Sequence, residues 1–319
     1  MSMVPSRSTP ISVLSATLLA LSAASSIALT MSTASVIDSH LHVWATAEES
    51  LVFPYDKAPP SQLQDMASPE LLLERMDDAG VDGALIIQPI NHKFDHSYVT
   101  NALQKYPHKF KGILLHDPSL SVELAVERLE QLVLLGYVGV RFNPYLWPNG
   151  ELMSEDSGNG LAVYRRCGEM NVPVCVMCFQ GFGLHFDDIL ALIAKSPDTI
   201  LILDHMGFCA LNDDGDKAFG QLLGLAKYRN VFVKVSALFR NTGGVDSYPY
   251  DKIKHERFLP LMNEFGAKRL MMGSDFPYVI ETEGSYKGAV ETVRSWVPAG
   301  YDRDAVLGGN AQRLFGSWN

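Results

Sequence analysis

The segment DSHLHVW, residues 38–44, places an aspartate and two histidines at every second position of a mostly apolar stretch. Side chains alternate between the two faces of a strand, so this spacing predicts that Asp38, His40 and His42 share one face. Imidazoles are unfavourable to bury unless they make hydrogen bonds or bind a ligand. The pattern therefore indicates a site for a metal ion or for a reacting carbonyl group.

Other candidate residues end apolar runs further along the chain. His205 follows LILD, and Asp275 follows LMMGS. His205 would add a third imidazole to the polar groups at these ends, and Asp275 would add a carboxylate. Four more polar residues at the ends of such runs could line the same site and bind an anionic small molecule: Gln88, Arg141, Asn143 and Lys234. Among these, arginine is suited to a carboxylate because it can donate two parallel hydrogen bonds.

Eight short apolar runs supply these residues, and helix-like segments separate nearly all of them. Near-continuous apolar strands are typical of a sheet that is covered on both faces. Eight such strands alternating with helices predict an α/β fold, a (β/α)8 TIM barrel, with its site at the carboxyl ends of the strands. No glycine-rich nucleotide-binding motif follows any run, which argues against an open sheet. The predicted strands are residues 36–44, 83–89, 110–118, 138–144, 172–180, 199–207, 231–238 and 269–277.

The first residues of the chain differ from the rest. Residues 1–37 contain no acidic residue and a single basic one, Arg7, and ISVLSATLLALSAASSIAL is apolar and rich in serine. This composition predicts a signal or transit peptide, or a gene-model extension if translation starts at Met31. We therefore divide the chain into residues 1–35 and a barrel domain of residues 36–319. The first alternative implies an organelle or secretion, and the second the cytoplasm, so localisation stays open.

Composition limits the partners of the chain. Its 319 residues are 47% hydrophobic and carry a formal net charge of -10. A chain with no basic run is not expected to bind nucleic acid, and no run in the barrel domain is long enough to span a bilayer. A homo-oligomer is left open. The four cysteines are expected to be reduced core thiols, since the C-x-x-C pair would face opposite sides of one strand: Cys167, Cys175, Cys178 and Cys209.

Some polar residues are expected to be structural. Asp204 is expected to face away from His205 as a structural partner, and His116 is expected to have a structural role at the end of the third strand. Five further histidines sit in predicted loops or helices, where a solvated imidazole is the default expectation: His92, His96, His108, His185 and His255.

Three motifs together resemble a known family. DSHLHVW, LDHMG and GSDFP, on the first, sixth and eighth predicted strands, are similar to the amidohydrolase superfamily in its amidohydrolase-related (amidohydrolase 2) branch. The closing GGNAQRLFG resembles the last helix of that family, so the resemblance covers residues 36–316. Within the branch, VGVRFNP and LILDHMG most resemble 2-pyrone-4,6-dicarboxylate lactonase-like hydrolases.

The resemblance implies a reaction and a role for five residues. It implies that His40, His42 and His205 face the substrate, that Asp275 is the general base and that Arg141 grips a carboxylate. The expected reaction is hydrolysis of a lactone, a cyclic ester, of a small carboxylated or sugar-derived substrate. In it, Asp275 deprotonates a water and the three imidazoles donate hydrogen bonds to the oxyanion.

The resemblance also bears on a cofactor. Metal-dependent relatives carry a histidine ligand at the end of the fifth strand, whereas this strand reads VCVMCFQG and the next histidine is His185. A single zinc or manganese ion on His40, His42 and Asp275 is possible, because three protein ligands and a water make a catalytic zinc site. The branch includes lactonases that work without metal, and the missing histidine fits them. We therefore expect no metal cofactor.

Two other functions stay open. A metal-dependent decarboxylase of the same family would act on an aromatic or unsaturated acid and would require a bound metal ion. A catalytically silent binding barrel would keep the fold without the chemistry. The presence of all four candidate catalytic residues argues against the silent barrel: His40, His42, His205 and Asp275.

Overall fold

Eight parallel strands pair in chain order to form the central sheet. The structure, a computed structural model, describes residues 34–148 and 150–318, so nearly all of the predicted targeting segment lies outside the described residues. Parallel neighbours require a crossover between strands, and helices provide it, as predicted. The strands are β1 (Ile37–Leu41), β2 (Gly83–Ile87), β3 (Phe110–Leu115), β4 (Tyr137–Phe142), β5 (Val174–Val176), β6 (Leu201–Leu203), β7 (Val231–Val235) and β8 (Leu270–Met272).

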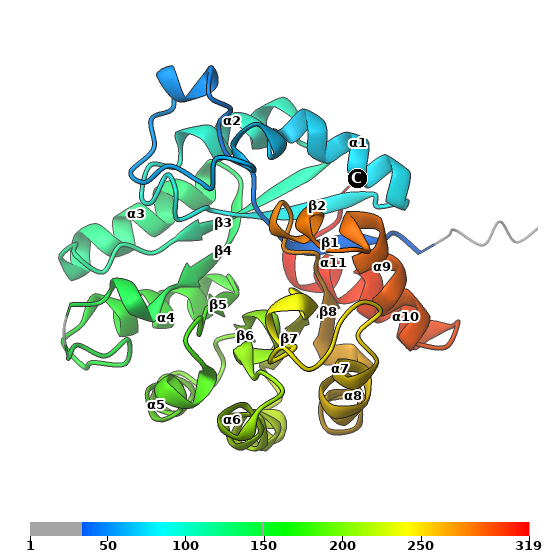
Figure 1. The fold of residues 1–319 in the computed structure, drawn as a ribbon. Coiled ribbons are helices and arrows are strands. Elements are labelled where there is room, and N and C mark those ends of the chain that lie inside the picture. The colour runs from blue at the N-terminus through cyan, green and yellow to red at the C-terminus, as the bar shows by residue number, and fades with distance from the viewer. Residues whose placement is uncertain (1–33, 149, 319) are drawn as a thin grey trace, which may run out of the picture. The chain divides into compact units, whose positions relative to one another are not determined.

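The sheet closes into a barrel between its first and last strands. Leu41 pairs with Phe276, just beyond β8. Two backbone hydrogen bonds cross the same seam, from Asp275 N to His40 O (2.8 Å) and from His42 N to Phe276 O (2.7 Å). Figure 1 shows the strands at the centre and the helices outside them. The predicted TIM barrel is confirmed, and the seam brings the candidates of β1 and β8 side by side.

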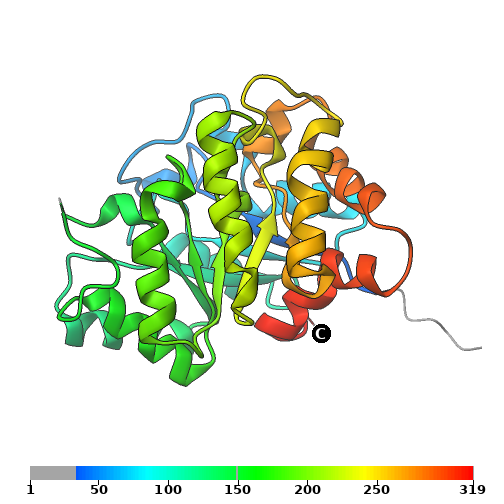
Figure 2. The same cartoon turned by 90° about the horizontal axis from the view of Figure 1, so that it is seen from below.

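Helices lie outside the strands, and Figure 2, seen from below, shows helices in front of them. The Ser68 hydroxyl caps the first helix, and Gly80 ends it in a left-handed conformation, φ 64°, as the sequence predicts. No helix within residues 34–148 and 150–318 is long and apolar enough to cross a membrane. The helices are α1 (Pro69–Ala79), α2 (Ser97–Lys105), α3 (Val122–Leu134), α4 (Asn159–Met170), α5 (Phe186–Lys195), α6 (Asp213–Leu223), α7 (Asp251–Ile253), α8 (Leu259–Phe265), α9 (Ser285–Trp296), α10 (Tyr301–Asp304) and α11 (Asn310–Phe315).

The barrel interior is apolar at the end where the strands begin. Side chains from β1, β2, β3, β5, β6, β7 and β8 form a cluster there with Ala311 and Phe315 of α11 and with Trp318. The Trp318 indole donates a hydrogen bond to the backbone oxygen of Ala84, near the start of β2 (3.4 Å). Because α11 and Trp318 close this end, the opposite end, where the strands finish, is left for a site.

One detail of β1 differs from the prediction. The register between β1 and β2 shifts between Asp38 and Leu41, as at a β-bulge, so strict alternation is broken. Asp38 does not join the histidines. Its Oδ1 accepts hydrogen bonds from the backbone amides of His40 (3.1 Å) and Ser274 (3.0 Å), and Tyr286 of the outer helix α9 lies beside it. The prediction that Asp38 shares a face with the two histidines is therefore wrong.

The packing of Gly308 against the chain just before β1 gives a stability test. A Cβ at Gly308 would overlap the backbone oxygen of Ser35, whereas a Cβ at Gly220 in α6 would meet nothing within 4 Å. We expect Gly308→Ala to lower the free energy of unfolding by about 1–3 kcal/mol through overpacking. Gly220→Ala should raise it by about 0.5–1 kcal/mol, because alanine favours the helix. Urea denaturation measures both, and an unchanged Gly308→Ala variant would contradict this close packing.

Candidate active site

A cavity of about 540 Å³ lies at the carboxyl ends of the strands, where a barrel is expected to hold its site. Six of the eight predicted site residues line it: His42, Gln88, Arg141, Asn143, His205 and Asp275. His40 and Lys234 do not line it, and both are fully buried. The sequence therefore predicted the position of the site and most of its polar wall.

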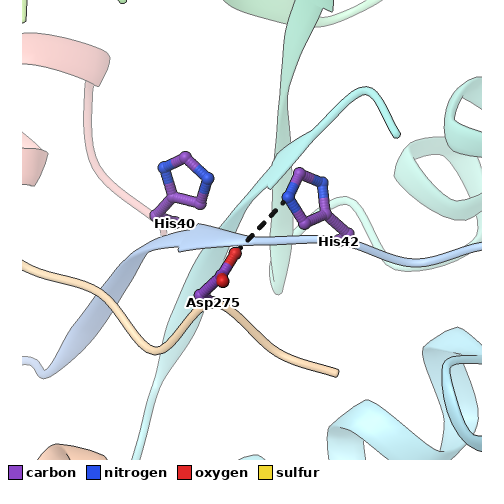
Figure 3. A group of neighbouring side chains, drawn as sticks. All are labelled: His40, His42 and Asp275. Atoms are coloured by element: carbon purple, nitrogen blue, oxygen red, sulfur yellow. Dashed lines mark ion pairs between the residues drawn. The ribbon is translucent and has the colours of Figure 1, made fainter. Parts of the chain in front are cut away.

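Asp275 lies at the centre of this group, three residues after β8. Its backbone is left-handed, with φ 62°, and its side chain is buried. One carboxylate oxygen, Oδ1, lies 3.6 Å from His42 Nε2 and 3.8 Å from His205 Nε2. The other, Oδ2, accepts a hydrogen bond from Arg240 Nε at 2.9 Å. Figure 3 shows Asp275 and His42 turned toward one another, with His40 beside them.

The environment of Asp275 suits proton transfer near neutral pH. Burial raises the pKa of its carboxyl group to about 6, and the positive charges of Arg240 and Arg141 oppose that rise. A general base works best when its pKa lies near the operating pH, because it must be ionised and yet able to take a proton. Asp275 meets both conditions.

The two ring nitrogens of His42 have different partners. Nδ1 lies 2.9 Å from the backbone oxygen of Ile87, which can only accept, so Nδ1 carries the proton. Burial lowers the pKa of His42 to about 3, so the ring is neutral and Nε2 holds a lone pair. That lone pair faces Asp275 Oδ1. Two acceptors 3.6 Å apart are compatible with a water or a cation between them. The expectation that His42 donates to an oxyanion does not agree with this tautomer.

His205 presents the opposite tautomer. It lies in a short segment after β6, Asp204–Phe208, where it and Met206 have left-handed φ angles of 53° and 52°. Its Nδ1 lies 2.8 Å from the Ser236 hydroxyl, which can donate, and its Nε2 faces the Asp275 carboxylate. The negative charge of Asp275 favours a proton on Nε2. His205 is thus placed to donate into the cavity.

A buried charge network lies behind the cavity. The Asp204 carboxylate is 3.1 Å from Lys234 Nζ, 3.5 Å from Arg141 Nε and 3.2 Å from His40 Nδ1. A buried ammonium group requires such a carboxylate partner, which explains why Lys234 points away from the cavity. The prediction that Lys234 binds substrate does not fit this position. Asp204 has the structural place expected for it.

His40 completes that network from β1. Its Nδ1 lies 3.2 Å from Asp204 Oδ1 and 3.3 Å from Lys234 Nζ. Its ring is 4.1 Å from the His205 ring, centre to centre, and burial lowers its pKa well below the usual value. Its Nε2 has no hydrogen-bond partner among the described residues. His40 is therefore a neutral ring packed beneath the other two imidazoles.

Gln88 and Asn143 line the cavity but also hold its loops. The Gln88 amide donates to the backbone oxygens of Lys93 (3.0 Å) and Asp95 (2.8 Å). The Asn143 side chain accepts a hydrogen bond from the amide of Tyr145 (3.2 Å). Both side chains therefore fix the backbone around the cavity entrance in addition to lining the cavity.

The loop histidines are buried rather than exposed. His92 Nδ1 bonds the backbone oxygen of Pro54, and His96 Nδ1 bonds that of Phe94. Each ring nitrogen satisfies a backbone group that would otherwise be buried without a partner. The expectation of solvated imidazoles is wrong for these two residues. His116, expected to be structural, bonds the Asn159 side chain.

Sequence reasoning missed Arg240. It ends a short helical segment, Leu238–Arg240, five residues beyond β7, and its guanidinium lies 4.6 Å from the ring centre of Tyr278. The predictions used only residues within the apolar runs, and Arg240 lies two residues beyond the seventh run, 231–238. The basic residue in SALFRN, directly after the seventh run, was the available signal. Apolar and aromatic wall residues were missed as well: Ile90, Leu115, Tyr145, Leu146, Met177, Phe179 and Phe208.

Three residues of the site could hold a metal ion. His40, His42 and Asp275 each offer a ligand atom, and these atoms lie within 4.8 Å of one another. The unpartnered Nε2 of His40 and the lone pair on His42 Nε2 fit a divalent cation such as zinc. Directly after β5, the cavity wall contains Met177 in place of the histidine that would add a further metal ligand.

The fold and site define an amidohydrolase, and the chain belongs to that family, whose model matches residues 37–317. A relative, 4-sulfomuconolactone hydrolase of Rhizobium radiobacter, is 27% identical over 298 residues, covering 88% of this chain and 89% of its own. A crystal structure from Pseudomonas putida, assigned as a 2-pyrone-4,6-dicarboxylic acid hydrolase, is 26% identical with a TM-score of 0.71. It covers 89% of this chain and 98% of its own.

A more distant barrel holds zinc. An amidohydrolase from Burkholderia multivorans was solved with bound zinc and is 18% identical to this chain, with a TM-score of 0.63. The match covers 89% of this chain and all of the other (100%). At this identity the likeness shows the fold alone.

Removing Lys234 tests the buried charge network. Lys234→Met would leave the buried carboxylate of Asp204 short of one cation, which typically lowers the free energy of unfolding by about 3–5 kcal/mol. The matched control Lys252→Met removes an exposed lysine of α7 and should change it by less than about 0.5 kcal/mol. Urea denaturation compares the two. Equal stability of both variants would mean that Arg141 alone balances Asp204.

Proposed function

We propose that the protein hydrolyses a lactone of a small anionic substrate, with Asp275 as the general base. The observation that carries this proposal is a buried carboxylate with a pKa of about 6 that faces two imidazoles in the wall of a cavity. Both named relatives support it, because a muconolactone and a pyrone are both cyclic esters.

The attacking water would lie between His42 Nε2 and Asp275 Oδ1. Both atoms accept hydrogen bonds, so one water can donate a hydrogen to each and direct a lone pair at the lactone carbonyl. Asp275 takes one proton as the new C–O bond forms. When the tetrahedral intermediate collapses, the ring C–O bond breaks and protonated Asp275 returns the proton to the leaving oxygen. In this scheme His42 positions the water.

The oxyanion would be stabilised by His205 and Arg141. His205 has the Nε2 proton that donation requires, and the Arg141 guanidinium lines the same cavity. A donor placed where negative charge develops is worth about 3 kcal/mol in the transition state. His40 packs against His205 and keeps that ring in place.

The cavity favours an anionic substrate with an apolar body. Arg141, Arg240 and Lys57 line it, and aliphatic and aromatic side chains form most of the remaining wall. The guanidinium groups can each make paired hydrogen bonds to a carboxylate or a sulfonate. We therefore propose a small anionic lactone as the partner of this site.

We further propose that hydrolysis requires no resident metal. Met177 stands at the end of β5, where a histidine would add a ligand, and Arg240 already gives Asp275 a positive partner. Two guanidinium groups also make the site electropositive, which disfavours a divalent cation. If a metal is bound, His40, His42 and Asp275 would hold it, and it would polarise the substrate carbonyl.

Metal content separates this proposal from its rival. Stoichiometric zinc or manganese in the purified protein, with activity lost on chelation and restored by the metal, would favour a metal-dependent enzyme, including a decarboxylase. Lactone hydrolysis that survives a chelator supports the metal-independent reaction. The observation that favours a metal-dependent enzyme is the set of possible ligands on His40, His42 and Asp275.

Replacement of the base tests the function directly. On a panel of carboxylated and sulfonated lactones, Asp275→Asn should lower kcat by about 100-fold to 10,000-fold, because the base is lost. Asp302→Asn changes an exposed carboxylate of α10 and should leave kcat unchanged. Opening of the lactone ring is followed by absorbance or by proton release. Equal activity of the two variants would exclude Asp275 as the base, and no turnover of any lactone by the wild type would favour a silent barrel.

The pH dependence provides a second test. Only ionised Asp275 can take a proton, so kcat/KM of chelator-treated protein should rise with pH, with a midpoint near pH 6. Arg240 lowers the pKa of Asp275, so Arg240→Gln should move this midpoint to higher pH. Arg229→Gln, which changes an exposed arginine, is the matched control. A midpoint that Arg240→Gln leaves in place, or moves downward, would contradict the assignment.

A further inference from the structure

A second cavity, of about 650 Å³, adjoins the first. It lies between the loop after β5 and the loop after β6, beside helix α6, which neighbours α5 in Figure 1. The two cavities share four wall residues: Phe179, Gln180, Phe208 and Arg240. A ligand held at Asp275 therefore needs only to pass these residues to reach the second cavity.

Aromatic rings lead from the reacting centre to this shared wall. The ring of His205 lies 4.9 Å from that of Phe208, and Phe208 lies 5.8 Å from Phe179. Phe179 continues to Tyr145 at 6.5 Å. Phe179 is 56% exposed and lines both cavities, so its ring is accessible to a ligand that extends from one cavity into the other.

The loop that forms the far wall is firmly held. The buried guanidinium of Arg257 donates to the backbone oxygens of Cys209 (2.8 Å) and Ala210 (2.6 Å) and pairs with Asp216. These bonds fix the chain just beyond Phe208. The cavity is thus a feature of the folded barrel.

The second cavity carries less positive charge than the first. Beside the shared Arg240, its wall contains Lys217 and Asp214, one of each sign, whereas the first cavity adds two cations, Arg141 and Lys57, against the one carboxylate of Asp275. The anionic group of a ligand would therefore bind in the first cavity, and the part that reaches the second would be uncharged.

We propose that the second cavity is a subsite for an uncharged, apolar or aromatic arm attached to the lactone ring. This inference rests on the proposed function and extends it, because it makes the substrate larger than a bare anionic lactone. The ring and its anionic group bind beside Asp275 and Arg141. The arm crosses the edges of Phe208 and Phe179 and lies against α6.

Two lactones with the same anionic ring test the subsite, one without an arm and one with a phenylpropyl arm. The wild type should show a kcat/KM at least about tenfold higher for the armed lactone, since each buried methylene is worth roughly fourfold. Phe179→Ala removes the shared aromatic edge, and Gln221→Trp fills the second cavity from the surface of α6. Both should reduce the armed-to-unarmed ratio of kcat/KM to about 1. Leu134→Ala, an exposed residue of α3, is the control and should preserve the ratio.

The outcomes separate the subsite from the function. Hydrolysis of both lactones with a ratio that neither variant changes overturns the subsite and leaves the proposed function intact. If neither lactone is hydrolysed, the proposed function fails, and calorimetry with the same two lactones decides the subsite. Tighter binding of the armed lactone to the wild type, lost in Gln221→Trp, supports it, and equal binding overturns it. Gln221 lies on a helix surface, so its variant remains informative if Phe179→Ala does not fold.

Discussion

The seam between β1 and β8 is the constraint on which the site depends. Asp275 and His40 are far apart in the chain, and the bond from Asp275 N to His40 O joins them. The bond from His42 N to Phe276 O repeats the contact, and the Asp38 carboxylate bridges the amides of both strands. Because the backbone is fixed on both sides, the Asp275 carboxylate is held against His42 without a direct bond to it.

Two buried carboxylates in one site have different functions because their surroundings differ. The negative charge of Asp204 is compensated by the positive charges of Lys234 and Arg141 beside it. Asp275 accepts a hydrogen bond from Arg240, and burial raises its pKa to about 6. Groups whose environments differ in this way are those that divide structural and proton-transfer roles. Burial, with the positive charges of Lys234 and Arg141, keeps His40 neutral, and Asp275 is the carboxylate that lines the cavity.

The sequence predicted what depends on periodicity and missed what depends on local backbone geometry. The eight apolar runs form eight strands, and His205 and Asp275 follow the sixth and the eighth. The carboxyl ends of the strands meet at one face of any such barrel, so the sequence could place both residues at the site. The irregularity in β1 separates Asp38 from the face that carries His40 and His42. The side chain of Lys234 pairs with the buried carboxylate of Asp204 and does not reach the cavity. Arg240 enters the site from beyond its strand. Such features depend on contacts between distant segments, which no local pattern encodes.

Hydrogen-bond direction limits what the three imidazoles can do. All three are buried and their pKa values are lowered, so each is neutral and has one N–H to donate. In His42 that proton is committed to Ile87, so the lone pair faces the carboxylate. In His205 the Nδ1 atom accepts a hydrogen bond from the Ser236 hydroxyl, so the ring proton is on Nε2, which faces the cavity. The same residue type therefore accepts on one side of Asp275 and donates on the other, as hydrolysis requires: one acceptor for the water and one donor for the oxyanion.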